Sequence, residues 1–424
     1  MFIELIKKSL NVFIIRVLSI LSGFLFTYFV TKLYGSKGIG IFVLCQSILM
    51  ISILISLFGT DIASVKFISK YFSNGNYSKI KSIYLNILKI VLPISIMLSI
   101  SIYFLRFYVS DFFFDDLGSE VGIFFSVLCI IPLSIIYIHS ESLRGMKEVE
   151  LYSILKYFLI PSLSIVLLFF LYSSNNIYIP IFSYCIAIII TAVLSFVVWI
   201  YKSQFLKYDF DYDLNNNVIK SSFPFFISSS MLFLLQWIDV IFLGYYKSSS
   251  DVGIYSVAVK ISMFSSIILF AINSIVAPKI SDYFSSNKID HLKHIIKASS
   301  KLMFFSTIPI LILILVFSSF ILNLFGQDFI LGKTSLQILV LGQFFNVLCG
   351  SVGYILNMTE NQIIFRNITV LSVIVNILIN LILIPIYGIV GAAIASMLSL
   401  ALWNIISCIY IYKKFNISTI WFVK

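Results

Sequence analysis

Four charged side chains fall within long apolar stretches of this sequence, where charge is rare. Arg16, Lys89 and Lys260 are basic, and Asp239 is acidic. On insertion scales, a charge at the centre of a membrane-spanning helix costs about 2.5–3.5 kcal/mol, so such residues commonly mark a binding site or an ion pathway. Three bases against one acid favour a site that binds an anion by charge, without making or breaking a bond.

Arg16 and two further lysines are candidates for contact with an anionic cargo. Arg16 lies about two turns into the first apolar stretch. It either faces a central cavity or extends to the nearby head groups, because a rise of about 9 Å is within reach of a long side chain. Lys89 and Lys301 lie 212 residues apart. They either line opposite walls of an inner vestibule or simply follow the positive-inside rule.

Two further groups of titratable residues leave similar alternatives open. Asp239 and Lys260 fall at similar depths in neighbouring apolar stretches. Either they neutralise one another, or Lys260 faces the cargo while Asp239 tunes it or carries a coupling proton. His139 and Glu141 precede Arg144 by about one turn. They either relay protons or form an ion pair at the membrane interface.

Composition indicates that transmembrane helices position these residues. Of the 424 residues, 60% are hydrophobic and 11% are charged, and the mean hydropathy is +1.06. The apolar runs are about 20 residues long, which is the length an α-helix needs to cross a bilayer, and they lack the alternation of a β-barrel. We expect twelve spans, at residues 11–32, 38–60, 83–106, 121–143, 151–173, 178–201, 221–246, 254–277, 302–325, 334–358, 364–386 and 388–412.

The second half of the sequence repeats features of the first. Ile68–Ser73 and Ile280–Ser285 share the pattern Ile-Ser-x-Tyr-Phe-Ser at an offset of 212 residues, half the length of the chain. Six spans per half let both halves enter the membrane in the same direction, which predicts two bundles related by a pseudo-two-fold axis along the membrane normal. We expect an N-terminal bundle at residues 1–206 and a C-terminal bundle at 207–424, with a cavity between them.

The distribution of basic residues orients the chain and excludes other classes. With both termini cytoplasmic, 21 of the 29 lysines and arginines fall on the cytoplasmic side and five on the opposite side. This asymmetry predicts that topology, and it accounts for the net charge of +11 without a nucleic-acid-binding domain. No outer loop exceeds about 15 residues, which argues against a polymerase or ligase. The five cysteines lie singly in apolar runs, which predicts neither disulfides nor a metal site.

Short motifs along the chain resemble those of one transporter family. They are Leu33–Phe42, Leu57–Asp61, Trp237–Gly244, Asp251–Ile261 and Ile384–Ala395. Each is weak by itself, but their order and spacing resemble the polysaccharide flippases of the O-antigen-unit (Wzx) type. Those flippases belong to the multidrug/oligosaccharidyl-lipid/polysaccharide exporter superfamily, and the resemblance covers nearly the whole chain.

The resemblance implies a MATE-like flippase that moves an undecaprenyl-pyrophosphate-linked oligosaccharide across a bacterial plasma (inner) membrane by alternating access. It implies a role in O-antigen or capsule synthesis, with no catalytic residue, bound cofactor or metal, and it leaves coupling to a proton or sodium gradient open. It suggests three kinds of partner: membrane lipids, a polysaccharide polymerase and a chain-length regulator. It suggests no nucleic-acid partner. The alternative is a multidrug/cation antiporter of the same superfamily, whose cavity we would expect to be acidic. The predicted substrate-binding residues are Arg16, Lys89, Asp239, Lys260 and Lys301.

Overall fold

The computed structural model describes residues 2–113, 120–174, 176–204, 207 and 217–422, and every regular element in these ranges is helical. Helices are the expected solution for an apolar chain in lipid, because each backbone N–H and C=O finds its partner within the helix. By packing, the chain divides into two compact units, Met1–Phe233 and Leu234–Lys424. The predicted boundary between residues 206 and 207 stays a prediction.

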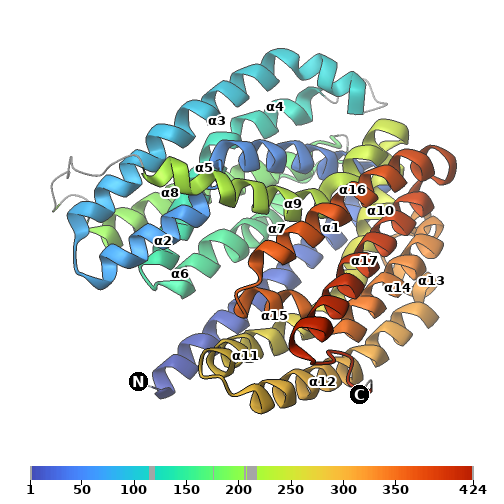
Figure 1. Ribbon diagram of the computed structural model, residues 1–424. Coiled ribbons are helices and arrows are strands. Elements are labelled where there is room, and N and C mark those ends of the chain that lie inside the picture. Colours follow the sequence, from blue (N-terminus) through green and yellow to red (C-terminus); the bar gives the residue numbers. More distant parts are fainter. Residues whose placement is uncertain (1, 114–119, 175, 205–206, 208–216, 423–424) are drawn as a thin grey trace. The chain divides into compact units, whose positions relative to one another are not determined.

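The first unit begins with an unusually long helix, α1 (Phe2–Leu57), which covers the first two predicted spans (Figure 1). The backbone leaves helical geometry at Gly35, where φ is 66° and ψ is −166°. Glycine adopts this conformation without the steric cost that a side chain would bring. The predicted loop between the two spans is therefore reduced to a kink.

A tight corner joins α1 to α2 (Thr60–Ser73). Phe58 and Gly59 both have positive φ, of 47° and 74°. A Cβ atom built on Gly59 would lie 2.3 Å from the backbone oxygen of Ser222 and 2.5 Å from the nitrogen of Phe226. Glycine is therefore required here both by the conformation and by the close approach of α9 (Asn217–Tyr246).

The remaining helices of the first unit follow in chain order. They are α3 (Tyr77–Phe113), α4 (Glu120–Leu128), α5 (Ile130–Gly145), α6 (Val149–Ser153), α7 (Leu159–Phe170) and α8 (Ile179–Ser203). Between α6 and α7 the chain forms a π-helical turn at Ile154–Phe158. Such turns are rare and are frequent at functional sites.

The second unit contains the end of α9 and eight further α-helices. They are α10 (Ser249–Ser262), α11 (Ser266–Ser285), α12 (Ile289–Val316), α13 (Ser318–Asn323), α14 (Lys333–Cys349), α15 (Val352–Met358), α16 (Gln362–Tyr387) and α17 (Ile389–Phe415). The span predicted at 334–358 is broken at Gly350, where φ is 71°, and the helical segments Gln327–Cys349 and Val352–Met358 are bent by 44°.

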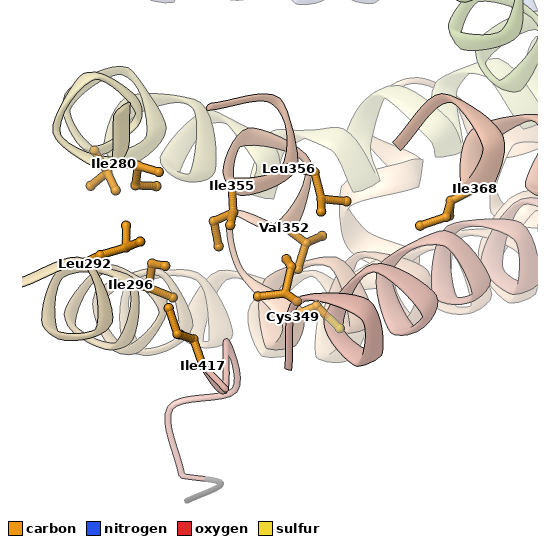
Figure 2. Packing of buried hydrophobic residues seen from close by; sticks show 11 residues of the cluster. Ile280, Leu292, Ile296, Cys349, Val352, Ile355, Leu356, Ile368 and Ile417 are labelled. Carbon is orange, nitrogen blue, oxygen red and sulfur yellow. The ribbon is translucent and has the colours of Figure 1, made fainter. Parts of the chain in front are cut away.

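Apolar packing fixes the short helix α15 beyond this break (Figure 2). Val352, Ile355 and Leu356 are buried against Ile280 of α11 and Ile296 of α12. Many close dispersion contacts of this kind hold membrane helices together, since lipid tails remove most of the hydrophobic drive between helices.

The multi-span, all-helical fold that the sequence predicted is confirmed. Within the described residues, nine helices are long and apolar enough to cross a membrane, or ten if the bent pair is one span. The kinked helix α1 is one of these although it covers two predicted spans, and in α9 the described apolar segment is the shorter Phe233–Tyr246. The total of twelve spans stays a prediction. The five cysteines are free thiols, and four of them are buried.

Candidate functional site

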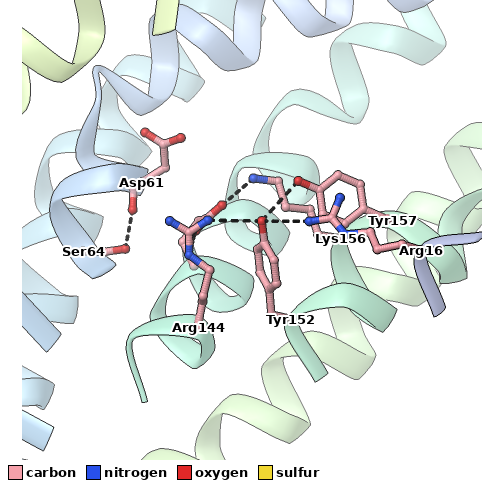
Figure 3. Close-up of polar contacts among 8 residues, drawn as sticks. Arg16, Asp61, Ser64, Arg144, Tyr152, Lys156 and Tyr157 are labelled. Atoms are coloured by element: carbon pink, nitrogen blue, oxygen red, sulfur yellow. Dashed lines mark hydrogen bonds and ion pairs between the residues drawn. The ribbon is translucent and has the colours of Figure 1, made fainter. Parts of the chain in front are cut away.

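A cluster of charged and aromatic side chains lies inside the first unit (Figure 3). Arg16 comes from α1, and Glu141 and Arg144 come from α5. Tyr152 comes from α6, and Lys156 and Tyr157 come from the π-helical turn. We call these six residues the Glu141 cluster. Only Arg16 among them belongs to the predicted substrate-binding residues.

Glu141 is the central anion of the cluster and is 3% exposed. Its Oε1 lies 2.5 Å from the Lys156 ammonium, and its Oε2 lies 3.2 Å from Nε of Arg144. A buried carboxylate is tolerated when it is paired in this way, because desolvation of a lone charge costs several kcal/mol. Of the two alternatives that the sequence left open for Glu141, the observed contacts are those of an ion pair.

The Tyr152 hydroxyl is a second acceptor for the same cations. It lies 3.5 Å from NH2 of Arg16 and 3.3 Å from NH1 of Arg144, which both donate to it. It also lies 3.1 Å from the hydroxyl of Tyr157. The Arg16 guanidinium lies over the Tyr157 ring, 3.5 Å from its centroid, in a cation–π contact. Two arginines from different helices therefore converge on one hydroxyl.

The π-helical turn explains how Tyr152 and Tyr157 meet. In a regular α-helix, residues five positions apart point about 140° away from one another. The i→i+5 geometry of a π turn returns them to the same side of the helix. The turn also brings Lys156 to Glu141, with the Lys156 ammonium 4.4 Å from the ring of Tyr137.

Asp61 is a second carboxylate in the same region, in the first turn of α2 (Figure 3). Burial raises the pKa of its carboxyl, and the positive charge of Lys156 opposes that rise. Among the side chains drawn in Figure 3, three are cations, Arg16, Arg144 and Lys156, and they come from three neighbouring segments. Their convergence suits the site to attract an anion.

His139 has partners of its own, on the other side of α5 from Glu141. It is fully buried. Its Nε2 lies 2.8 Å from the Tyr84 hydroxyl, and its Nδ1 lies 2.9 Å from Oγ of Ser195. The ring stacks on Trp199. The described contacts give His139 a packing role and do not connect it to Glu141.

Asp239 of α9 occupies a separate polar site in the second unit, where it is 5% exposed. Its carboxylate accepts hydrogen bonds from the hydroxyl of Tyr255 at 2.7 Å, from Nδ2 of Asn380 at 2.6 Å and from Nδ2 of Asn376 at 3.3 Å. The hydroxyl of Ser396 donates as well. These four donors are neutral, and they come from α10, α16 and α17.

The remaining predicted residues lie outside both sites. Lys260 is half-buried on α10 and is not among the described partners of Asp239. Lys89 on α3 and Lys301 on α12 are exposed, and the Lys301 ammonium lies 6.0 Å from the ring of Trp421. The contacts described for these residues do not decide whether they bind cargo.

Sequence reasoning missed Lys156, Tyr152 and Tyr157. Lys156 is one of the 21 basic residues that the predicted topology places on the cytoplasmic side, and that topology already accounts for its charge. The two tyrosines are five positions apart, a spacing that points to one face only if a π turn is assumed. Glu141 and Arg144 were the signal that could have indicated this site. A carboxylate in an apolar helix is stable only when it is paired with a cation, and Lys156 was one of the cations near it in the sequence.

Comparison with known proteins places these features in a family. A family model described as polysaccharide biosynthesis protein matches residues 5–284, and a MatE family model matches residues 224–382. A probable low-salt glycan biosynthesis flippase of Haloferax volcanii, Agl15, is 30% identical over 186 residues. That match covers 44% of this chain and 39% of the relative.

Solved structures show the fold over the whole length. The lipid II flippase MurJ in an inward-closed conformation has a TM-score of 0.75 at 17% identity, with coverage of 97% of this chain and 89% of that one. An inward-facing multidrug resistance transporter of the MATE family has a TM-score of 0.73 at 14% identity, covering 95% and 94% of the two chains. The names of these relatives agree with the prediction of a transporter rather than an enzyme. The chain belongs to the polysaccharide biosynthesis protein family, and its fold is that of the MATE transporters.

Proposed function

We propose that this protein is a flippase that moves a polyprenyl-pyrophosphate-linked oligosaccharide from the inner to the outer leaflet of a bacterial plasma membrane. The product would serve surface polysaccharide synthesis, as O-antigen or capsule. The protein would work by alternating access between two six-span bundles, with twelve spans in all and both termini cytoplasmic. The observation that carries the proposal is the convergence of three partly buried cations, Arg16, Arg144 and Lys156, in the Glu141 cluster.

The physical requirement for such a carrier is electrostatic. A sugar head group with a diphosphate at its base loses its hydration in hydrocarbon, at a cost of many kcal/mol. Arginine and lysine replace that hydration with charge-assisted hydrogen bonds, and arginine matches phosphate oxygens bidentately. Arg16 and Arg144 are thus the proposed contacts for the diphosphate, and Lys156 adds positive charge beside them. The glycan named for the relative in Haloferax volcanii agrees with a glycan-bearing cargo.

The other predicted residues keep secondary roles in this proposal. Lys89 and Lys301, both exposed, would attract the anionic head group before it reaches the buried site. Lys260 would contact the cargo from the second unit. Asp239 would carry a coupling proton or sodium ion, because its carboxylate has neutral partners and can exchange a cation without breaking an ion pair. A polysaccharide polymerase and a chain-length regulator are the proposed partners.

One observation favours a second candidate, a multidrug/cation antiporter. Asp239 is a buried acid whose described donors carry no charge, and such a group could also hold a cationic drug. The convergence of cations in the first unit disfavours this candidate, because a cationic drug would be repelled there.

The test is transport by the full-length protein in proteoliposomes. The probe is a fluorescent single sugar on a short polyprenyl diphosphate, whose leaflet is read by quenching from outside. We expect Arg16→Ala to slow transport at least tenfold, since a charge-assisted hydrogen bond contributes about 1.5–3 kcal/mol. Lys202→Ala is the matched control, because Lys202 is also a half-buried cation and pairs with Glu148 at 2.8 Å outside the Glu141 cluster.

Unchanged transport in Arg16→Ala, with normal amounts of folded protein, would count against the cationic site. Transport of a cationic dye without transport of the diphosphate probe would favour the antiporter instead. Transport of neither would contradict both candidates.

A further inference from the structure

Glu141 occupies the position in the cluster that an anionic ligand would require. Its two oxygens face Lys156 and Arg144, and phosphate oxygens are bound by the same two types of donor. A carboxylate at this point therefore resembles a bound anion supplied by the protein. If the proposed function holds, the diphosphate of the cargo and Glu141 are rivals for the same cations.

The two ion pairs of Glu141 differ in strength and access. Lys156 lies 2.5 Å from Oε1, and its side chain is 10% exposed. Arg144 lies 3.2 Å from Oε2, and its side chain is 38% exposed. Within the described part of the chain, Oε2 makes no hydrogen bond, so the contact with Arg144 is an ion pair without hydrogen-bond geometry. Arg144 is the weaker and more accessible partner.

The remaining contacts of Arg144 are also easy to replace. Its NH1 donates to the Tyr152 hydroxyl at 3.3 Å, a long hydrogen bond to a neutral acceptor. Arg16 donates to the same oxygen at 3.5 Å. A phosphate group that approached from the exposed side of Arg144 would offer charged acceptors to both guanidinium groups.

We propose that Glu141 is a resident counter-anion, which the diphosphate displaces from Arg144 when the cargo binds. This inference rests on the proposed function and adds a role to it. In the empty site, Glu141 limits repulsion among the three cations. In the loaded site, Glu141 stays with Lys156, while Arg144 and Arg16 hold the diphosphate. On release, Glu141 takes Arg144 back, so it keeps the site from binding its cargo too tightly.

The experiment measures binding of inorganic pyrophosphate to the purified, full-length protein in detergent. Glu141→Gln keeps the size of the side chain and removes the rival charge. We expect it to bind pyrophosphate about tenfold more tightly than wild type, which corresponds to about 1.4 kcal/mol. In proteoliposomes the same variant should transport the diphosphate probe more slowly at saturation, because release becomes limiting.

Three further variants separate displacement from other effects. Glu141→Asp keeps the charge and should bind pyrophosphate within about twofold of wild type. Glu148→Gln is the matched control, because Glu148 also pairs with a lysine, but outside the Glu141 cluster. In an Arg144→Gln background, Glu141→Gln should no longer tighten binding, because the rivalry acts through Arg144. This double variant loses one charge of each sign and leaves no new unpaired charge at this ion pair. If Glu141→Gln alone does not fold, the double variant is compared with Arg144→Gln.

The outcomes for the two proposals differ. If wild type binds pyrophosphate and Arg16→Ala weakens that binding, while Glu141→Gln leaves it unchanged or weaker, the counter-anion role is wrong and the cationic site stands. If tightening by Glu141→Gln persists without Arg144, displacement from Arg144 is wrong. If folded wild-type protein binds no pyrophosphate, the proposed diphosphate site itself is wrong.

Discussion

At the scale of single residues, the two units stabilise a buried carboxylate in different ways. Glu141 lies between two cations, whereas Asp239 accepts hydrogen bonds from four neutral groups. Removing one partner of a buried ion pair leaves an uncompensated charge, so such a pair exchanges only for another charged group. Neutral donors can turn away or change partner at a smaller cost. The sequence indicates Arg16 and Asp239 as functional candidates by their charge alone. The structure shows that Arg16 lies among other charged groups, whereas the described partners of Asp239 are neutral.

The coupling role of Asp239 leads to a prediction for Asp239→Asn. The amide keeps the size of the side chain but cannot bind a proton or attract a sodium ion. We expect transport by the variant to lose its acceleration by an imposed gradient and to retain a basal rate. Proton and sodium gradients are applied separately across proteoliposomes, and the one that accelerates wild type identifies the ion.

Asp251→Asn is the control for this experiment. Asp251 forms a capping box with Ser248 at the start of α10, so it tests loss of an acid in the same unit without loss of the buried site. If the gradient accelerates transport by Asp239→Asn as much as transport by wild type, Asp239 is not the coupling residue.

At the scale of elements, the corner between α1 and α2 depends on glycine more strongly than any sequence motif indicated. The motif Leu57–Asp61 was read as a family resemblance, and its glycine proves to face the backbone of α9. Gly59→Ala would force a backbone shift of α9 or of the corner itself. We expect a loss of roughly 1–3 kcal/mol of stability, because a strained left-handed conformation adds to the clash.

Thermal unfolding of the purified protein in detergent tests this expectation. Gly23→Ala is the matched control, since a Cβ on Gly23 would meet nothing within 4 Å and Gly23 is helical. Equal midpoints for the two variants would show that the approach of α9 to Gly59 is looser than described.

The elements also show where prediction from sequence ends. Apolar runs located nearly every helix, because the length needed to cross a membrane is a strong constraint. The same runs could not show that only a kink at Gly35 separates the first two spans, or that a helix breaks at Gly350, since both depend on backbone torsions. Lys156 was hidden for a related reason. Its role depends on a π-helical turn, which hydrophobic periodicity does not reveal.

At the scale of the whole molecule, the distribution of lysine and arginine predicts that both termini are cytoplasmic. Reporter fusions in bacterial cells check this. We expect green fluorescent protein fused after Lys424 to fluoresce, and alkaline phosphatase fused after Lys333 to be active, since Lys333 falls among the five basic residues of the opposite side. Fusions after Lys202 provide the cytoplasmic control. An active phosphatase at Lys424 would reverse the orientation and, with it, the direction from which cargo reaches the Glu141 cluster.

The π-helical turn at Ile154–Phe158 makes the chain tolerant of a particular kind of genetic change. A helix with one extra residue in a turn can lose that residue and remain a continuous helix of nearly the same length. After a deletion between Tyr152 and Lys156, Tyr152 and Tyr157 would be four positions apart in a regular α-helix and would still lie on the same face. A single-codon deletion here would therefore keep the two tyrosines of the Glu141 cluster together, whereas the same deletion inside the regular helix α7 would rotate the residues before it by about 100° relative to those after it.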